Sequence, residues 1–155
     1  MMKNIITVFL FVSLAAGCGI KQYNAKKVEK IQQGIAGQVF ELIGNKMPSP
    51  DRPGNPDGSP IQAIVYIFEL TNHSEQIQEA GVYTNISSKK IATIKTAANG
   101  EFKIALPEGV YSLFVKVAEG YFANLYDEKM NIHPITISKD QITVTKVKVD
   151  YKATY

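Results

Sequence analysis

The 155-residue sequence contains no tryptophan, a single cysteine and a single arginine. One cysteine, Cys18, excludes an internal disulfide. The net charge of +3 is small, and no basic stripe with interleaved aromatic residues occurs, so we expect no nucleic-acid partner. Hydrophobic residues make up 45% of the chain and charged residues 20%, which is typical of a folded domain and not of a disordered chain.

The N-terminus shows the pattern of a secretory signal peptide. Lys3 is followed by a mainly apolar run over residues 5–16, and small residues precede Cys18. The run is too short to cross a bilayer, for which about 20 residues are needed. We therefore expect a leader over residues 1–17 that is removed on export.

The stretch Leu14-Ala-Ala-Gly-Cys18 resembles a bacterial lipobox, although Leu14 lies one position further upstream than is commonest. This resemblance implies cleavage before Cys18 and acylation of its thiol and its new amino group. Two or three acyl chains would anchor the protein stably, whereas one binds marginally. The alternative is an ordinary signal peptide with an incidental cysteine.

Residues 18–33 are polar and weakly patterned, so we expect them to form a tether between the lipid and the domain. No acidic run follows Cys18. In some lipoproteins such a run resembles a surface-export tag, and its absence favours an outer-membrane anchor that faces the periplasm over one exposed at the surface.

From about Gly34 onward, the sequence predicts short strands. Apolar residues alternate with polar ones over 102–106 and 111–117, and Pro107-Glu-Gly109 between them suits a turn. Asn99-Gly100, the dipeptide favoured in two-residue hairpin turns, follows a further strand over 90–96. The interpretation is three consecutive antiparallel strands joined by hairpins.

The other strands are expected over 35–43, 61–70, 82–86 and 141–151, with a short extended piece at 135–138. Residues 61–70 are apolar on both faces, which predicts a central strand covered on both sides. Gly37 predicts a bulge or a close backbone approach. In the last strand, the apolar phase changes between Val144 and Val147, which predicts a β-bulge near residues 145–146.

Seven short strands without a helix predict an all-β fold, a seven-stranded antiparallel β-sandwich, as a single domain over residues 34–155. Four segments carry a family resemblance: Gly37-Gln-Val39, 96–102, 106–111 and Gly120-Tyr121. They resemble the carboxypeptidase regulatory-like domains, which are prealbumin-like sandwiches related in fold to transthyretin. The wider pattern looks like small bacterial envelope lipoproteins of unknown function.

The resemblance implies a non-catalytic module, so we expect no enzyme activity and no cofactor. Ala97-Ala98 stands where an acidic residue is commoner in the family, which argues against a metal there. Transthyretin-like hydrolases rely on histidine and arginine, and Arg52 is the single arginine, so this enzyme class is the weakest alternative.

If the seven strands run alternately up and down, the loops 71–81 and 120–134 lie at the same end of the sandwich. Aromatic, acidic and histidine side chains would gather there as a recognition surface for a protein partner, a glycan or a weakly held cation. These residues are His73, Tyr121, Tyr126, Asp127, Glu128 and His133, with Glu75 beside them.

Two alternatives to this surface remain open. Tyr121 and Phe122 could simply fill the core while the two histidines lie at the surface. The proline-rich loop 44–60 could instead present a stiff binding surface or cover a sheet edge.

The sequence thus predicts an envelope lipoprotein, held at a membrane through Cys18, whose domain is a structural or protein-binding module. A glycan-binding or nutrient-uptake accessory module is the alternative, and an unidentified envelope protein or glycan would be the partner.

Overall fold

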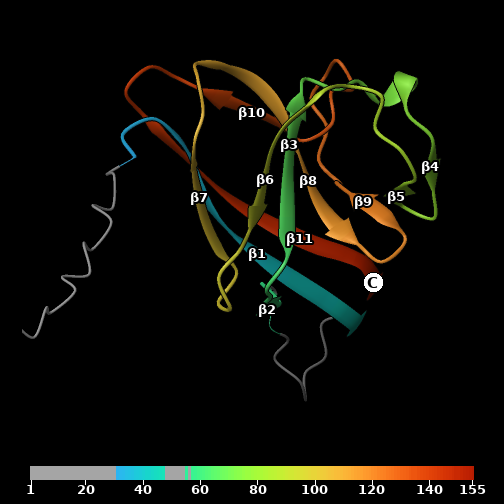
Figure 1. Ribbon diagram of the computed structural model, residues 1–155. Helices are drawn as coiled ribbons and strands as arrows, with labels where there is room; N and C mark the ends of the chain where they lie inside the picture. The colour runs from blue at the N-terminus through green and yellow to red at the C-terminus, as the bar shows by residue number, and fades with distance from the viewer. Residues whose placement is uncertain (1–30, 48–54, 56) are drawn as a thin grey trace, which may run out of the picture.

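The structure, a computed structural model, describes residues 31–47, 55 and 57–155 (Figure 1). They form two open β-sheets and one short 3₁₀ turn, η1 (His73–Glu75), so the prediction of an all-β domain is confirmed. The strands are β1 (Gly34–Asn45), β2 (Ser59–Pro60), β3 (Ile64–Glu69), β4 (Gln78–Glu79), β5 (Val82–Tyr83), β6 (Lys90–Lys95), β7 (Glu101–Ala105), β8 (Gly109–Val117), β9 (Gly120–Phe122), β10 (Pro134–Ile137) and β11 (Ile142–Thr154). Cys18, the expected leader and most of the tether lie outside the described residues.

The smaller sheet, sheet A, is organised around β1. This strand pairs with β11 in parallel, and on its other side it pairs antiparallel with β7 and then with β2. Figure 1 shows β1, in blue to teal, beside the red β11. The expectation of antiparallel pairing throughout is therefore wrong for these two strands. A parallel pair needs a long connection, which the rest of the domain supplies here.

The larger sheet, sheet B, has seven strands, and all its pairings are antiparallel. Its order is β4-β5-β9-β8-β3-β6, and β10 pairs with the first half of β8. Because β3 lies between β8 and β6, the central position predicted for residues 61–70 is confirmed.

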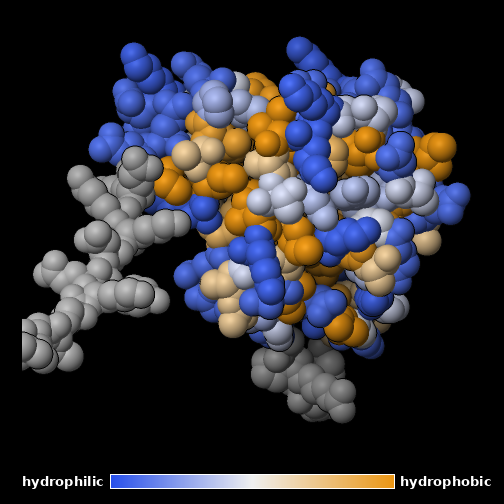
Figure 2. Space-filling model, viewed as in Figure 1, coloured by the Kyte–Doolittle hydropathy of each residue, from blue (hydrophilic) through white to orange (hydrophobic). Residues whose placement is uncertain are grey.

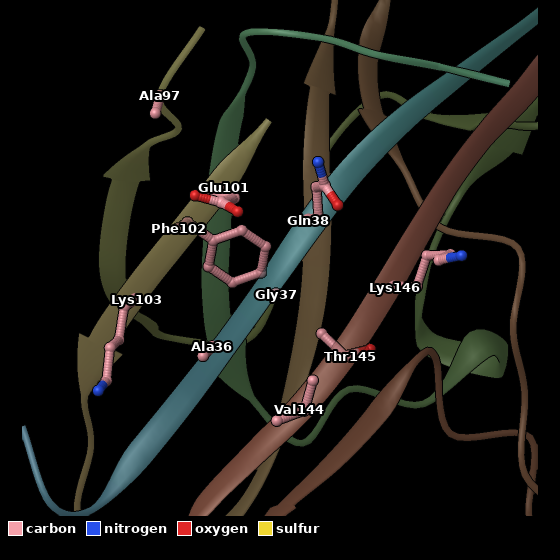
Figure 3. Close-up of a pocket in the computed structure, with 10 residues that line it drawn as sticks. All are labelled: Ala36, Gly37, Gln38, Ala97, Glu101, Phe102, Lys103, Val144, Thr145 and Lys146. Carbon is pink, nitrogen blue, oxygen red and sulfur yellow. The ribbon is translucent and has the colours of Figure 1, made fainter. Parts of the chain in front are cut away.

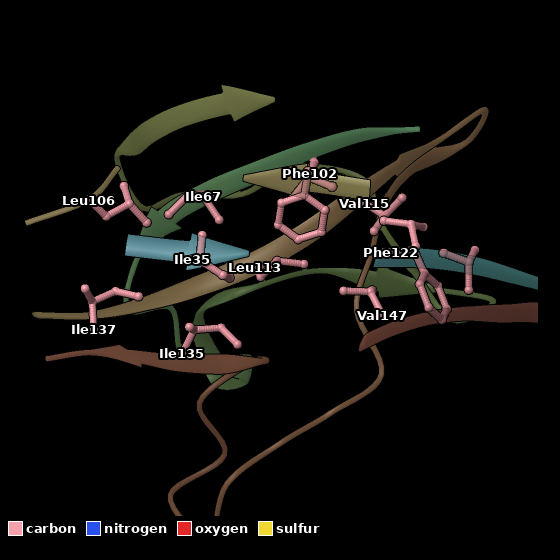
Figure 4. Packing of buried hydrophobic residues seen from close by; sticks show 13 residues of the cluster. Ile35, Ile67, Phe102, Leu106, Leu113, Val115, Phe122, Ile135, Ile137 and Val147 are labelled. Atoms are coloured by element: carbon pink, nitrogen blue, oxygen red, sulfur yellow. The ribbon is translucent and has the colours of Figure 1, made fainter. Parts of the chain in front are cut away.

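The main hydrophobic core lies between the two sheets. Figure 4 shows side chains from β1 and β11 of sheet A pointing into the same layer as those from β3 and β8 of sheet B. Fully buried members include Ile35, Val39, Val65, Leu113 and Val147. Burial of each such side chain is worth about 1.5–3 kcal/mol, so this layer holds the sheets together.

A second hydrophobic cluster covers the other face of sheet B. Its buried members are Phe68, Tyr83, Ile86, Phe114, Ala123 and Ile132. The last two come from the segment after β9, which packs onto the sheet here. Since Val65 and Ile67 face the main core and Phe68 faces this cluster, β3 is covered on both sides, as predicted.

The two hairpins expected around Asn99-Gly100 and Pro107-Gly109 do not form. A tight turn does exist at the first position, where the Gly100 amide donates to the Ala97 carbonyl at 2.9 Å. However, β6 pairs with β3 in sheet B, β7 pairs with β1 in sheet A, and β8 returns to sheet B. The chain crosses between the sheets at both turns, so these strands face each other across the core instead of pairing.

The bulge expected near residues 145–146 is also misplaced. The register between β1 and β11 is regular from Ile142 to Val149, and it shifts only after Val149, where β11 gains one residue over β1. Val144 does not turn inward, and 79% of it is exposed. At Gly37 the close-approach alternative is correct, because a Cβ there would lie 2.6 Å from the Thr145 carbonyl oxygen.

Candidate functional site

The loops 71–81 and 120–134 lie side by side, as predicted, but for a different reason. Since β8 is antiparallel to β3, it ends at the opposite end of sheet B from the loop that follows β3. The short strand β9 then turns back along β8 and returns the chain to that loop. The juxtaposition therefore depends on a hairpin at residues 118–119 that the sequence analysis did not identify.

Backbone hydrogen bonds join the two loops closely. The His73 amide donates to the Met130 carbonyl at 2.9 Å, and the Ile132 amide donates to the Thr71 carbonyl at 2.8 Å. The Asn72 side chain donates to the Lys129 carbonyl at 2.7 Å. These contacts make one preorganised surface from two distant segments, which we call the loop end.

Three rings at the loop end form a chain of hydrogen bonds. The Tyr83 and Tyr126 hydroxyls are 2.6 Å apart, and His73 Nδ1 lies 3.2 Å from the Tyr83 hydroxyl. The His73 and Tyr126 rings also meet edge to face at 5.5 Å. Burial and the Tyr126 hydroxyl both raise the pKa of Tyr83, so its phenol stays protonated. The predicted pair His73 and Tyr126 is thus brought together by Tyr83, which the sequence analysis missed.

Asp127 shapes the loop. Its carboxylate accepts from the Lys129 amide at 2.9 Å and from the Asn131 amide and side chain at 2.9 and 2.8 Å. These Asn131 bonds are the main reason that the pKa of Asp127 lies below its ordinary value. Glu128 beside it is exposed. Asp127 therefore holds the loop in shape, while Glu128 is accessible to a partner.

His133 is not at the surface, which contradicts both interpretations considered for it. Only 2% of it is exposed, and neither ring nitrogen has a hydrogen-bond partner within the described residues. Burial lowers the pKa of His133 to about 4. Its backbone takes a positive φ of 39° while its amide donates to the Leu125 carbonyl at 2.7 Å. This neutral, buried ring cannot contact a partner directly.

Tyr121 belongs to a different part of the surface. Its ring packs edge to face on Tyr66 and on Phe68, at the rim of the second cluster. The ring centroids are 5.3 Å apart for Tyr66 and 5.8 Å apart for Phe68. Lys116 Nζ lies 5.2 Å from the Tyr121 ring centroid, and Lys90 Nζ lies 5.1 Å from that of Tyr66. Each contact is worth about 0.5–1 kcal/mol at an exposed site. Tyr121 is half-buried, so the alternative that it only fills the core is incomplete.

Large apolar side chains are exposed at the loop end. Five of them lie in or directly before the two loops, namely Leu70, Ile77, Leu125, Tyr126 and Met130. Ile77 is 67% exposed and Leu125 is 52% exposed. Other large apolar side chains are exposed on the strands, among them Ile64, Ile91 and Val144, and Figure 2 shows apolar and hydrophilic side chains on one face of the molecule.

A shallow groove of about 840 Å³ crosses sheet A (Figure 3). Residues of β1, β7 and β11 line it, with Gly37 and Phe102 at its floor and Lys103 and Lys146 at its sides. Lys146 also forms an ion pair with Asp57 at 3.3 Å. This contact ties the end of the proline-rich loop to β11, whereas residues 48–54 and 56 of that loop lie outside the described residues.

No model of a protein family matches the sequence, and no curated protein matches it. Within the described residues, no helix is long and apolar enough to span a membrane, and no three histidine, cysteine, aspartate or glutamate side chains are grouped as a metal site would need.

Proposed function

We propose that this protein is a lipoprotein of the bacterial envelope, anchored through Cys18, whose prealbumin-like β-sandwich binds a protein partner through the loop end. The leader pattern and the lipobox-like stretch before Cys18 support the anchor. The two sheets with a shared core support the sandwich.

The observation that carries the binding role is the apolar character of the loop end. Leu125 and Met130 are about half exposed, although the loop that bears them is fixed by Asp127 and by bonds to the neighbouring loop. Exposed apolar groups on a preorganised surface favour association, because binding removes them from water at little cost in ordering entropy. Tyr126 and Glu128 add the aromatic and polar groups that protein interfaces commonly contain.

Site-specific cross-linking in intact cells tests this function. A photoreactive amino acid replaces Leu125 or Met130 in one set of strains, and Val144 or Ile43 in a control set. All four side chains are exposed, but the control pair lies on β11 and β1 of sheet A. We expect one discrete adduct from positions 125 and 130 and none from 144 and 43.

A double variant completes the experiment. Leu125→Ser with Met130→Ser should reduce capture of the same partner at least about tenfold, whereas Val144→Ser with Ile43→Ser should leave it within about twofold. Unfolding midpoints of both variants establish that the domain is intact. Adducts of equal yield at all four positions, or capture that the loop-end variant leaves unchanged, would refute the proposed function.

A further inference from the structure

Two tyrosine hydroxyls differ from the others in the described residues, because they have no hydrogen-bond partner there. Of the eight tyrosines, Tyr23 lies outside the described residues. Hydroxyls of five others bond within the protein, namely those of Tyr83, Tyr111, Tyr126, Tyr151 and Tyr155. The hydroxyls of Tyr66 and Tyr121 have no hydrogen-bond partner in the part of the chain that the structure describes. The centroids of these two rings are 5.3 Å apart.

Two lysines flank this pair of rings and have no acidic partner among the described residues. Lys90 reaches over Tyr66 from β6, and Lys116 reaches over Tyr121 from β8. The ion pairs found in the described residues join Asp57, in the turn before β2, to Lys146 and Lys148 on β11 of sheet A. The cation–π contacts position both ammonium groups without neutralising them.

We propose that Tyr66, Tyr121, Lys90 and Lys116 form a binding site for an acidic polysaccharide on the outer face of sheet B. The C–H face of a sugar ring is apolar and slightly positive, so it packs on the electron-rich face of an aromatic ring. The two free phenols can exchange hydrogen bonds with sugar hydroxyls, and the two ammonium groups can pair with carboxylates along the chain.

A polysaccharide fits this surface better than a lipid bilayer does. Both tyrosine rings are half-buried, with their inner edges packed on Phe68 and Phe114, so they cannot insert deeply into a membrane. Two lysines give only a weak attraction to an anionic membrane, for which clusters of about four to eight basic residues are typical. The site is separate from the loop end, and therefore stands whether or not the proposed function holds.

Binding of polygalacturonate, a chain of sugar carboxylates, tests the proposal. The full-length protein is titrated in an uncharged, non-glycosidic detergent, with neutral dextran as the comparison. We expect polygalacturonate to bind, and to bind more weakly as salt rises, since screening weakens exposed charge pairs. Dextran should not bind measurably.

Variants locate the site. Lys90→Gln with Lys116→Gln should raise the dissociation constant about tenfold, and Tyr66→Phe with Tyr121→Phe, which keeps the rings, should raise it about threefold. Lys103→Gln with Lys139→Gln removes the same net charge from other surfaces, and this variant should change the dissociation constant less than about twofold. If the variants are unstable, polygalacturonate should still protect Lys90 and Lys116, but not Lys103, from acetylation in the unmodified protein.

Three results would overturn the proposal. They are equal weakening by both lysine pairs, equal affinity for dextran, and failure of the protein to bind polygalacturonate. Binding to vesicles of anionic lipid that depends on these four residues, with no binding of polygalacturonate, would assign the face to the membrane instead.

Discussion

The hydroxyls of Tyr83 and Tyr126 are hydrogen-bonded at 2.6 Å across 43 residues of sequence. Tyr83 is fully buried on β5, while Tyr126 is on the loop after β9, so this bond connects the sheet to the loop end. The structure gives it a measurable role in stability.

Tyr83→Phe should lower the free energy of unfolding by about 1 kcal/mol, because it removes the bonds to Tyr126 and His73 but keeps the ring. Tyr66→Phe is the matched control, since its hydroxyl has no partner in the described part of the chain. Chemical denaturation should show a lower midpoint for the first variant alone. Equal midpoints for both would contradict the role assigned to this bond.

His133 should make the fold sensitive to acid. Its pKa is about 4 in the folded protein and about 6.5 when unfolded, so below pH 6.5 the unfolded state binds more protons. Above pH 6.5 His133 therefore does not lower the free energy of unfolding. As the pH falls toward 4, the free energy of unfolding declines because of His133, by about 3 kcal/mol in total.

His133→Asn should remove this part of the pH dependence, whatever it does to stability at pH 7. Asparagine tolerates the positive φ of this position, which makes it the conservative choice. His73→Asn should leave the dependence in place. The measurement is the free energy of unfolding at intervals from pH 7.5 to 4.5, and an unchanged slope in His133→Asn would show that other groups cause it.

Gly100 should be far less replaceable than Gly44, although both have a positive φ, of 80° and 73°. A Cβ at Gly100 would lie 2.4 Å from the Val39 carbonyl oxygen, whereas one at Gly44 would have nothing within 4 Å. Gly44→Ala should cost about 1 kcal/mol from backbone strain alone. Gly100→Ala should cost about 2 kcal/mol more, from overpacking, and similar thermal midpoints would contradict this account of the turn.

Sequence patterns predicted the longer strands, but not the short strand β9 and not which strands pair. The alternation over 102–106 placed Phe102 in the core correctly, and the turn at Asn99-Gly100 also forms. A turn fixes only the few residues around it, however, and does not determine which sheet each flanking strand joins. The parallel pairing of β1 with β11 depends on residues more than a hundred positions apart, and no local pattern reports such a contact.

The sequence likewise predicted some features of the candidate site and not others. The sequence predicted that His73 and Tyr126 lie near each other, but it did not predict the β8–β9 hairpin that brings their loops together. The burial of His133 and the separation of Tyr121 from the loop end could not be predicted, since both depend on how the segment after β9 folds onto sheet B. The hydroxyl of Tyr66, which has no partner among the described residues, has no sequence signature, because the fold determines which groups come near it.

The anchor at Cys18 is the central claim of this account, because it determines where the binding surfaces act. Intact-mass spectrometry of the protein purified from membranes tests it most directly, with a Cys18→Ser strain as the control. The account predicts a chain that begins at Cys18 and carries two or three acyl groups, and that is lost from the membrane fraction in the control. A chain with an unmodified Cys18 thiol, or retention of the Cys18→Ser protein in the membrane, would contradict it.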